Sequence, residues 1–97
     1  MKAESSHALK AHFGNVPLQL NVRGMTVAAA MRDVEIYLDR LLLSDIKRAS
    51  ILHGKGTGAL RDAIRNYLSS SSFITSCGPG TPREGGEGIT VFTIGGD

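Results

Sequence analysis

The 97-residue sequence has one cysteine, no tryptophan and three prolines. A single cysteine, Cys77, excludes an internal disulfide and a cysteine-based metal cluster, and it suits a reducing, cytoplasmic compartment. Two tyrosines and three phenylalanines leave little aromatic surface for stacking nucleic-acid bases. No apolar run approaches the roughly 18 residues that a membrane-spanning helix needs, and the N-terminus lacks the apolar core of a signal peptide. We therefore expect one domain without a membrane partner.

A large excess of charge of one sign is also absent. Eleven basic and nine acidic residues give a formal net charge of +2, which permits a nucleic-acid partner but does not argue for one. The histidines His7, His12 and His53 are not spaced as a ligand set, and no acidic cluster accompanies them. The sequence therefore assigns no metal site.

What the sequence does contain is a clear alternation of strand and helix patterns. Leu18, Leu20 and Val22 alternate with polar residues, which is typical of a half-buried strand. Thr26 is placed to cap the long apolar-periodic stretch that follows it. The predicted elements are strands at 18–23, 48–53, 73–77 and 89–94 and helices at 26–43 and 57–69, the second capped by Thr57.

The order βαβαββ predicts a fold of the α/β class. Its layers would form an α+β two-layer sandwich, with helices on one side and a sheet on the other. We expect a four-stranded mixed sheet with both helices packed on the apolar face of the first strand. The opposite face, which carries Gln19, Asn21 and Arg23, would stay open or be covered only by residues 1–15. Residues 1–15 are expected to be a flexible arm or linker end, and 16–97 the domain.

One stretch, Leu52–Leu60, joins the second strand to the second helix through a glycine-rich turn. It places His53 on one side and Lys55 between two glycines. Such a turn brings free backbone N–H groups and a helix N-terminus to one point, which favours anions and phosphate above all. We take this loop as the candidate functional centre.

Ligands of sheets with parallel strands gather beyond the carboxyl ends of those strands. The carboxyl ends of the first and second strands would lie at this edge. The glycine-rich loop Gly78–Gly88 would leave from the same edge if the third strand is parallel to them. The side chains expected to converge are Arg23, His53, Lys55, Arg83, Glu84 and Glu87.

Known nucleotide-binding signatures fit this loop poorly. A P-loop needs glycine where Ala49 stands and Ser or Thr where Gly56 stands. Gly54, Gly56 and Ala59 match the dinucleotide fingerprint, but no acidic residue ends the next strand to hold a ribose. A nucleotide triphosphatase or dinucleotide domain is therefore disfavoured.

Phosphodiester chemistry without a metal is open to these residues. His53 would act as acid or base, while Lys55 or Arg23 stabilises the charged transition state. Each also has a plain structural interpretation: His53 as a polar cap on its strand, Lys55 as a solvated loop cation, and Arg23 as the partner of Asp45 or Glu87. Both interpretations stay open at this point.

Three segments, Leu20–Met25, Ile51–Arg61 and Gly85–Val91, resemble the small MutS-related (Smr) domain, most closely the C-terminal domain of the second bacterial MutS family. The resemblance covers Val16–Ile94. It implies the βαβαββ fold, nucleic-acid binding, and a structure-selective nicking endonuclease that acts on branched or structured DNA in repair or recombination control. It also implies a larger MutS-type parent chain that dimerises. Related bacterial proteins are linked to stalled ribosomes.

The resemblance and the topology together mark the candidate residues. Arg23, His53 and Lys55 are the catalytic candidates. The nucleic-acid-binding candidates are Arg23, His53, Gly54, Lys55, Gly56, Thr57, Gly58, Arg61 and Arg83. No cofactor is assigned, although a divalent cation, Mg²⁺ or Mn²⁺, stays open for cleavage.

One position departs from the family pattern. The family's first motif has aspartate where this chain has Asn21, and an amide cannot serve as a carboxylate base. If that aspartate takes part in cleavage, this domain binds without cutting or cuts slowly. Three hypotheses therefore stand: a nicking endonuclease, a non-catalytic module that docks on DNA, RNA or a ribosome, and a site for a small phosphate compound or nucleotide.

Overall fold

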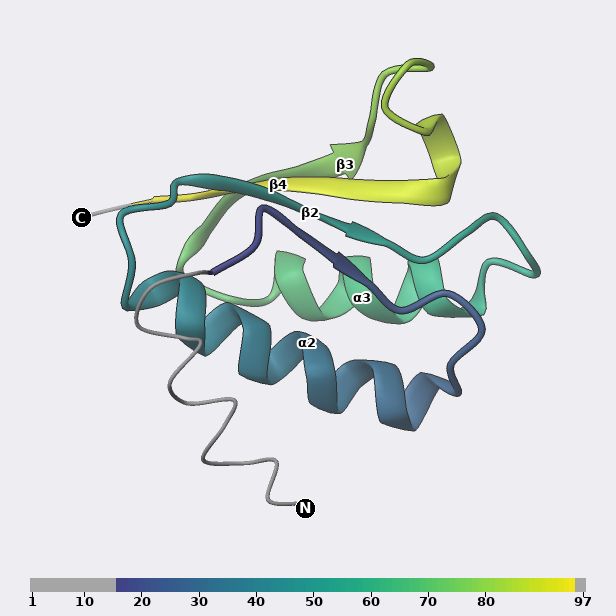
Figure 1. Ribbon diagram of the computed structural model, residues 1–97, viewed down its shortest axis with the longest axis horizontal. Coiled ribbons are helices and arrows are strands. Elements are labelled where there is room, and N and C mark those ends of the chain that lie inside the picture. The colour runs from purple at the N-terminus through teal and green to yellow at the C-terminus, as the bar shows by residue number, and fades with distance from the viewer. Residues whose placement is uncertain (1–15, 96–97) are drawn as a thin grey trace.

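The computed structural model describes residues 16–95, and the predicted arm at 1–15 lies outside them. Both helices cover one face of a four-stranded sheet, and no described element covers the other face (Figure 1). The elements are β1 (Gln19–Asn21), α2 (Val27–Leu42), β2 (Arg48–Leu52), α3 (Ala59–Ser69), β3 (Ile74–Pro79), the 3₁₀ turn η1 (Gly86–Gly88) and β4 (Ile89–Ile94). The predicted fold class is confirmed.

The sheet has the strand order β1-β2-β4-β3. β1 pairs in parallel with β2, whereas β4 runs antiparallel to both of its neighbours. Therefore β1, β2 and β3 run in the same direction. Leu52 pairs with Ile89 and Pro79 pairs with Thr90, so the carboxyl ends of β2 and β3 meet at one edge of the sheet.

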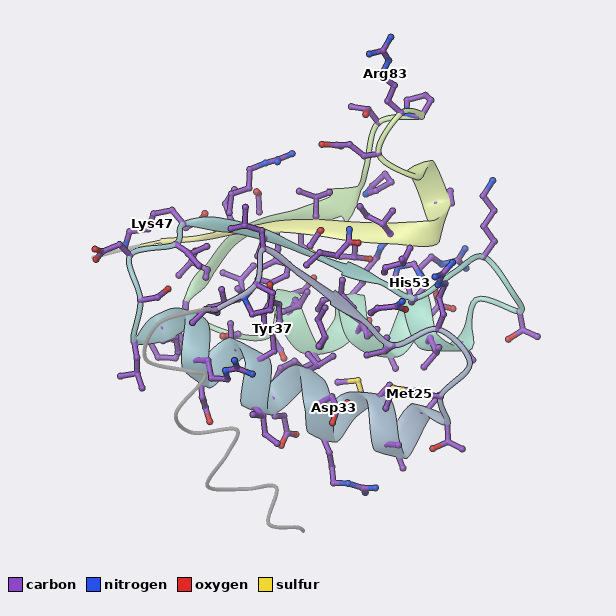
Figure 2. All side chains as sticks on the ribbon, viewed as in Figure 1. Met25, Asp33, Tyr37, Lys47, His53 and Arg83 are labelled. Carbon is purple, nitrogen blue, oxygen red and sulfur yellow. The ribbon has the colours of Figure 1, made fainter. Side chains whose placement is uncertain are left out.

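Helix α2 begins as its sequence predicts. The Thr26 hydroxyl accepts a hydrogen bond from the Ala29 N–H at 3.2 Å and caps the helix. Tyr37, on its buried face, donates its hydroxyl to the Pro17 carbonyl at 2.6 Å, which holds the segment before β1 against the helix (Figure 2). Burial raises the pKa of Tyr37 to about 12.

The core lies between the helices and the covered face of the sheet. Its largest fully buried side chains are Tyr37, Phe92, Leu41, Ile51, Ile64, Leu68, Val22, Val34 and Thr90. None of the helices among residues 16–95 has the length and apolar character of a membrane span.

The elements match the predicted ones with shifts of one or two residues at several ends, and two strands begin one residue later than predicted. Leu18 does not share the buried face of β1, because it precedes the strand and is 64% exposed. β3 begins at Ile74, one residue later than predicted, and continues to Pro79, while Phe73 stays in the preceding turn, half-exposed. In both cases an apolar residue next to a strand has an exposed side chain, although its carbonyl still accepts a backbone hydrogen bond, Leu18 from Ser50 at 3.0 Å and Phe73 from Gly95 at 2.8 Å.

Candidate functional site

A cleft of about 400 Å³ opens beyond the carboxyl ends of β1 and β2. The turn after β1, the loop after β2 and the first turn of α3 form its walls. Its lining residues are Gly24, Met25, Thr26, Val27, His53, Gly54, Lys55, Gly56, Thr57, Gly58, Ala59, Leu60 and Arg61. The glycine-rich loop therefore lies where the topology predicts a ligand.

The loop needs glycine at three of its positions. Gly54, Gly56 and Gly58 have φ values of 82°, 32° and 91°, a region that other residues rarely adopt. Helix α3 starts at Ala59 with Gly58 as its N-cap, so the prediction of Thr57 as the N-cap is wrong. Thr57 instead accepts a hydrogen bond from the Ala59 N–H at 3.2 Å through its side chain.

This local geometry delivers a helix N-terminus to the cleft. The first-turn N–H groups of a helix have no carbonyl partner within the helix, and the helix dipole gives that end partial positive charge. Leu60 and Arg61, in the first turn of α3, line the cleft. The cleft wall is thus suited to an anion.

His53 lies at the base of the loop and is only 4% exposed. Its Nδ1 lies 2.8 Å from the Gly54 carbonyl oxygen, and its Nε2 lies 2.8 Å from the Thr90 hydroxyl. Because a carbonyl only accepts, Nδ1 carries the proton and donates it. Thr90 also accepts from the Arg65 Nε at 2.8 Å, so its own hydroxyl proton points to His53 Nε2.

The surroundings of His53 favour the neutral ring. Burial lowers the pKa of His53, and the nearby cations Arg65 and Arg61 lower it further, against the opposing effects of the Gly54 hydrogen bond and Glu87. Both ring nitrogens are bonded within the protein. In this arrangement His53 holds the loop to β4, as the polar-cap interpretation predicts, and its nitrogens are not presented to a ligand.

The side chains of Asn21 and Arg23 are joined by hydrogen bonds at the carboxyl end of β1. The Asn21 side-chain oxygen accepts hydrogen bonds from the Arg23 backbone N–H at 3.0 Å and from its Nε at 3.3 Å. A Cβ atom on Gly54 would meet Arg23 Cγ at 3.4 Å, so the arginine side chain lies against the loop. Arg23 pairs with neither Asp45 nor Glu87 among the described ion pairs.

Two further cations border the cleft. Lys55 is exposed on the loop. Arg61 packs its guanidinium over Gly58, and its Nε lies 3.0 Å from the exposed carboxylate of Asp62. The described lining of the cleft contains no carboxylate of its own. Chemically, this set can bind and neutralise a phosphate group.

The β3–β4 loop reaches the cleft only through its last residues. The Gly88 carbonyl accepts from the N–H groups of His53 at 3.1 Å and Gly54 at 2.8 Å. Glu87 lies 3.3 Å from Arg65, beside the buried network. The predicted approach of the β3–β4 loop to the cleft is therefore found at the end of the loop that leads into β4, at Glu87 and Gly88.

Arg83 and Glu84 do not join the cleft. Glu84 pairs with Arg48 of β2 at 3.3 Å. Arg83 projects from the outer tip of the loop, well apart from His53 (Figure 2). The predicted convergence of these two residues with His53 is therefore wrong, because the loop rises away from the sheet before it returns at Gly88.

Sequence reasoning missed Arg65 and Thr90. Arg65 donates to Thr90 and, at 3.2 Å, to the Ile89 carbonyl, and so connects α3 to β4. One signal was available: Arg65 follows Arg61 by four residues and thus shares its helix face. Thr90 carried a weaker signal, as a hydroxyl on the apolar face of β4.

The fold and the cleft define a small α/β domain with a cleft lined by Lys55 and Arg61 at the carboxyl edge of its sheet. The model of the Smr domain family matches residues 20–94. The chain belongs to the Smr domain family, as its motifs predict.

Relatives of this chain carry the same domain within longer proteins. It is 41% identical over 90 residues to Endonuclease MutS2 of Caldicellulosiruptor saccharolyticus, which covers 93% of this chain and 11% of that protein. It is 46% identical over 80 residues to Endonuclease MutS2 of Bacillus cytotoxicus, which covers 82% of this chain and 10% of that protein. The chain thus spans about a tenth of the relatives it matches.

Two solved structures are similar. The Smr domain of Thermus thermophilus MutS2 has a TM-score of 0.78 and 38% identity, covering 82% of this chain and 100% of that chain. YdaL, a stand-alone small MutS-related protein from Escherichia coli, has a TM-score of 0.69 and covers 97% of this chain and 79% of its own. At 19% identity YdaL supports the fold alone.

Proposed function

We propose that this domain binds the phosphate backbone of nucleic acid in the glycine-loop cleft. One observation carries the proposal: Lys55 and Arg61 line the cleft beside the N-terminus of α3, Arg23 lies against Gly54 of the same loop, and the described cleft lining contains no carboxylate. Cations and a helix N-terminus together attract phosphate.

The composition of the cleft favours a polymer over a free nucleotide. No aromatic side chain lines it, so a base gains no stacking surface there. No acidic side chain lines it to hold ribose hydroxyl groups. Contacts to the backbone alone fix register without reading sequence, so we expect binding that depends on nucleic-acid shape and on salt.

A salt titration of binding to a labelled branched duplex, followed by fluorescence anisotropy, tests this proposal. Lys55→Gln should weaken binding several-fold and reduce the slope of log affinity against log salt by about 1. Lys47→Gln is the matched control, since Lys47 is an exposed lysine at the opposite end of the sheet from His53 (Figure 2). Salt-independent binding, or equal losses in both variants, would contradict the proposal.

The second candidate function is cleavage. We propose that the domain nicks branched DNA as part of a longer, cytoplasmic MutS2-type protein, because its relatives at 41% and 46% identity are named Endonuclease MutS2. Divalent cations at phosphates are held by one or two carboxylates, and the described cleft lining supplies none. We therefore derive no step through Mg²⁺ or Mn²⁺.

Asn21 decides between cutting and docking. Its amide oxygen holds Arg23 in place, as a carboxylate oxygen would, but it cannot accept a proton from water as a base. If the native chain nicks supercoiled plasmid, cleavage does not need a carboxylate at this position. If only Asn21→Asp nicks, the native domain is a binding module for DNA, RNA or a ribosome, and cleavage by the native chain is contradicted.

A further inference from the structure

The outer side of α2 carries two large apolar side chains that are open to solvent. Ile36 is 54% exposed, and Leu43, the C-cap residue of the helix, is 89% exposed. The two residues are seven positions apart, which is about two helical turns, so they lie on one stripe of the helix surface. The sheet and α3 both lie above α2 in Figure 1, and the exposed stripe therefore points away from them.

Charged residues flank this stripe in a symmetric order. The helix reads RDVEIYLDR around Ile36, so an arginine and an aspartate precede it by four and three positions and follow it, in reverse order, by three and four. At about 100° per residue, Arg32 and Asp39 lie on one flank of the stripe. Asp33 and Arg40 lie on the other flank. Each flank thus carries one cation and one anion, on opposite sides of Ile36.

These four charges are not paired with one another or with their neighbours. None of the ion pairs found within residues 16–95 involves them. Arg32, Asp33 and Asp39 are exposed. Arg40 is half-buried, and its buried Nε has no hydrogen-bond partner. A partner surface with charges in the complementary order would therefore find all four side chains free to pair.

A second copy of α2 has that order when it packs antiparallel to the first about a two-fold axis at Ile36. Such an axis brings the same flank of both helices together. Arg32 then meets the partner's Asp39 on one flank, and Arg40 meets the partner's Asp33 on the other. In each pair the two residues differ by one position in height, about 1.5 Å along the axis. The symmetry repeats both pairs, and Ile36 packs on the partner's Ile36.

The two ends of the stripe also fit each other. The same axis brings Leu43 to the partner's Ala29, close to the start of its α2. A small side chain opposite a large exposed one lets the helices approach to the usual 8–10 Å, as estimated for helix pairs in general. A parallel pair would match Arg32 with the partner's Asp33 instead and set Leu43 against its own copy. The helix dipoles, which oppose each other in an antiparallel pair, favour the antiparallel arrangement.

We propose that the outer face of α2 is a self-association surface, on which a second copy of this chain packs antiparallel about a two-fold axis at Ile36. One 16-residue helix offers less than the roughly 800 Å² per partner of a standard interface, so the isolated domain should dimerise weakly, with a Kd of about 0.1–1 mM. Within a longer protein, tethering supplies effective concentrations in the same range. The surface is separate from the cleft, whose lining includes neither Ile36 nor Leu43.

Sedimentation equilibrium of the full chain, from about 20 μM to about 2 mM, tests this proposal. The weight-average mass of the wild type should rise from that of one chain towards that of two. Ile36→Asp should weaken dimerisation at least tenfold, because it sets two carboxylates against each other on the axis. Leu18→Asp is the matched control, since Leu18 is also an exposed apolar residue but lies before β1, and it should change the Kd less than twofold.

A charge exchange tests the antiparallel order. Arg32→Asp alone faces the partner's Asp39 with a like charge and should weaken dimerisation several-fold. Adding Asp39→Arg exchanges both charges of that flank and should restore the wild-type Kd to within about twofold. Amide chemical shifts of the core residue Phe92 confirm that each variant is folded.

Three results would overturn the proposal. A wild type that stays monomeric over the whole concentration range excludes self-association. Equal losses in Ile36→Asp and Leu18→Asp mean that the contact is not on α2. A double variant that dimerises more weakly than Arg32→Asp alone contradicts the antiparallel order, because in a parallel pair both exchanged residues would face like charges.

Discussion

Two glycine-rich loops leave the same edge of the sheet, but they differ in how they are held. Residues 53–58 are anchored to the buried side of the sheet, because the His53 ring forms hydrogen bonds with Gly54 and with Thr90 of β4. In the second loop, residues 80–88, the tip is held mainly by hydrogen bonds within itself, between Thr81 and Glu84, and by the exposed ion pair of Glu84 with Arg48. The first loop lines a cleft, while the second stands above the open face of the sheet.

The element that follows each loop explains this difference. The first loop runs into α3, so its backbone must deliver a helix N-terminus, and three glycines with positive φ make that reversal. The second loop runs through η1 into β4, whose N–H and C=O groups are taken up by sheet pairing. The proposed anion site at the first loop therefore depends on the helix that follows the loop and not on glycine content alone.

The largest expected effect tests whether the first loop depends on its buried anchor. His53→Ala should lower the free energy of unfolding by about 2–4 kcal/mol, because it removes a buried ring and leaves the Thr90 hydroxyl without its acceptor. Thr90→Val, of similar shape, should cost about 1–3 kcal/mol, since it strips hydrogen bonds from His53 and Arg65. Urea unfolding measures both.

The control for this comparison comes from the second loop. Arg83→Ala should change the free energy of unfolding by no more than about 0.5 kcal/mol, because Arg83 is exposed and makes no described ion pair. Losses of similar size in His53→Ala and Arg83→Ala would mean that the loops are not held differently.

The sequence predicts the βαβαββ order and the cleft because both follow from periodicity and strand direction. Alternating and helical patterns report which faces are buried, and the carboxyl ends of parallel strands define the ligand edge. The placement of Arg83 was not predictable in this way. Whether a long loop folds back or stands upright depends on hydrogen bonds within it, and the hydrogen bonds between Thr81 and Glu84 leave no trace in periodicity.

The burial of His53 was equally hidden in the sequence. A histidine next to glycine and lysine is compatible with an exposed base or an internal cap. The choice between them depends on Thr90 and Arg65, which are 37 and 12 residues away in the chain and meet it only in the folded sheet. Such long-range partners have no local pattern.

A change of pH should have a smaller effect on the free energy of unfolding, and this effect should come from His53 in the first loop. Burial, together with Arg65 and Arg61, lowers the pKa of His53 below its usual 6.5, so the unfolded chain binds a proton more readily than the native one. The stability that His53 contributes is therefore fully present above about pH 6.5 and is lost as pH falls through its lowered native pKa. Urea unfolding from pH 7.5 down to pH 5 should show this decline.

His53→Gln supplies the reference for the pH series, since glutamine does not titrate and the remaining ionisable groups are unchanged. The difference in free energy of unfolding between wild type and His53→Gln should shrink as pH falls below 6.5. A difference that stays constant, or grows on acidification, would show that the ring is not held neutral in the native loop.

The smallest expected effect lies in the second loop and concerns its local order. Thr81→Val keeps the side-chain shape but removes the hydroxyl that accepts from the Glu84 N–H, so it should cost at most about 1 kcal/mol of global stability. Local opening should be easier, and amide exchange of Glu84 and Gly86, both bonded to Thr81, should quicken. Amides of β4 such as Phe92 should exchange as in the wild type. Faster exchange throughout β4 would mean instead that this loop, like the first, is fastened to the core.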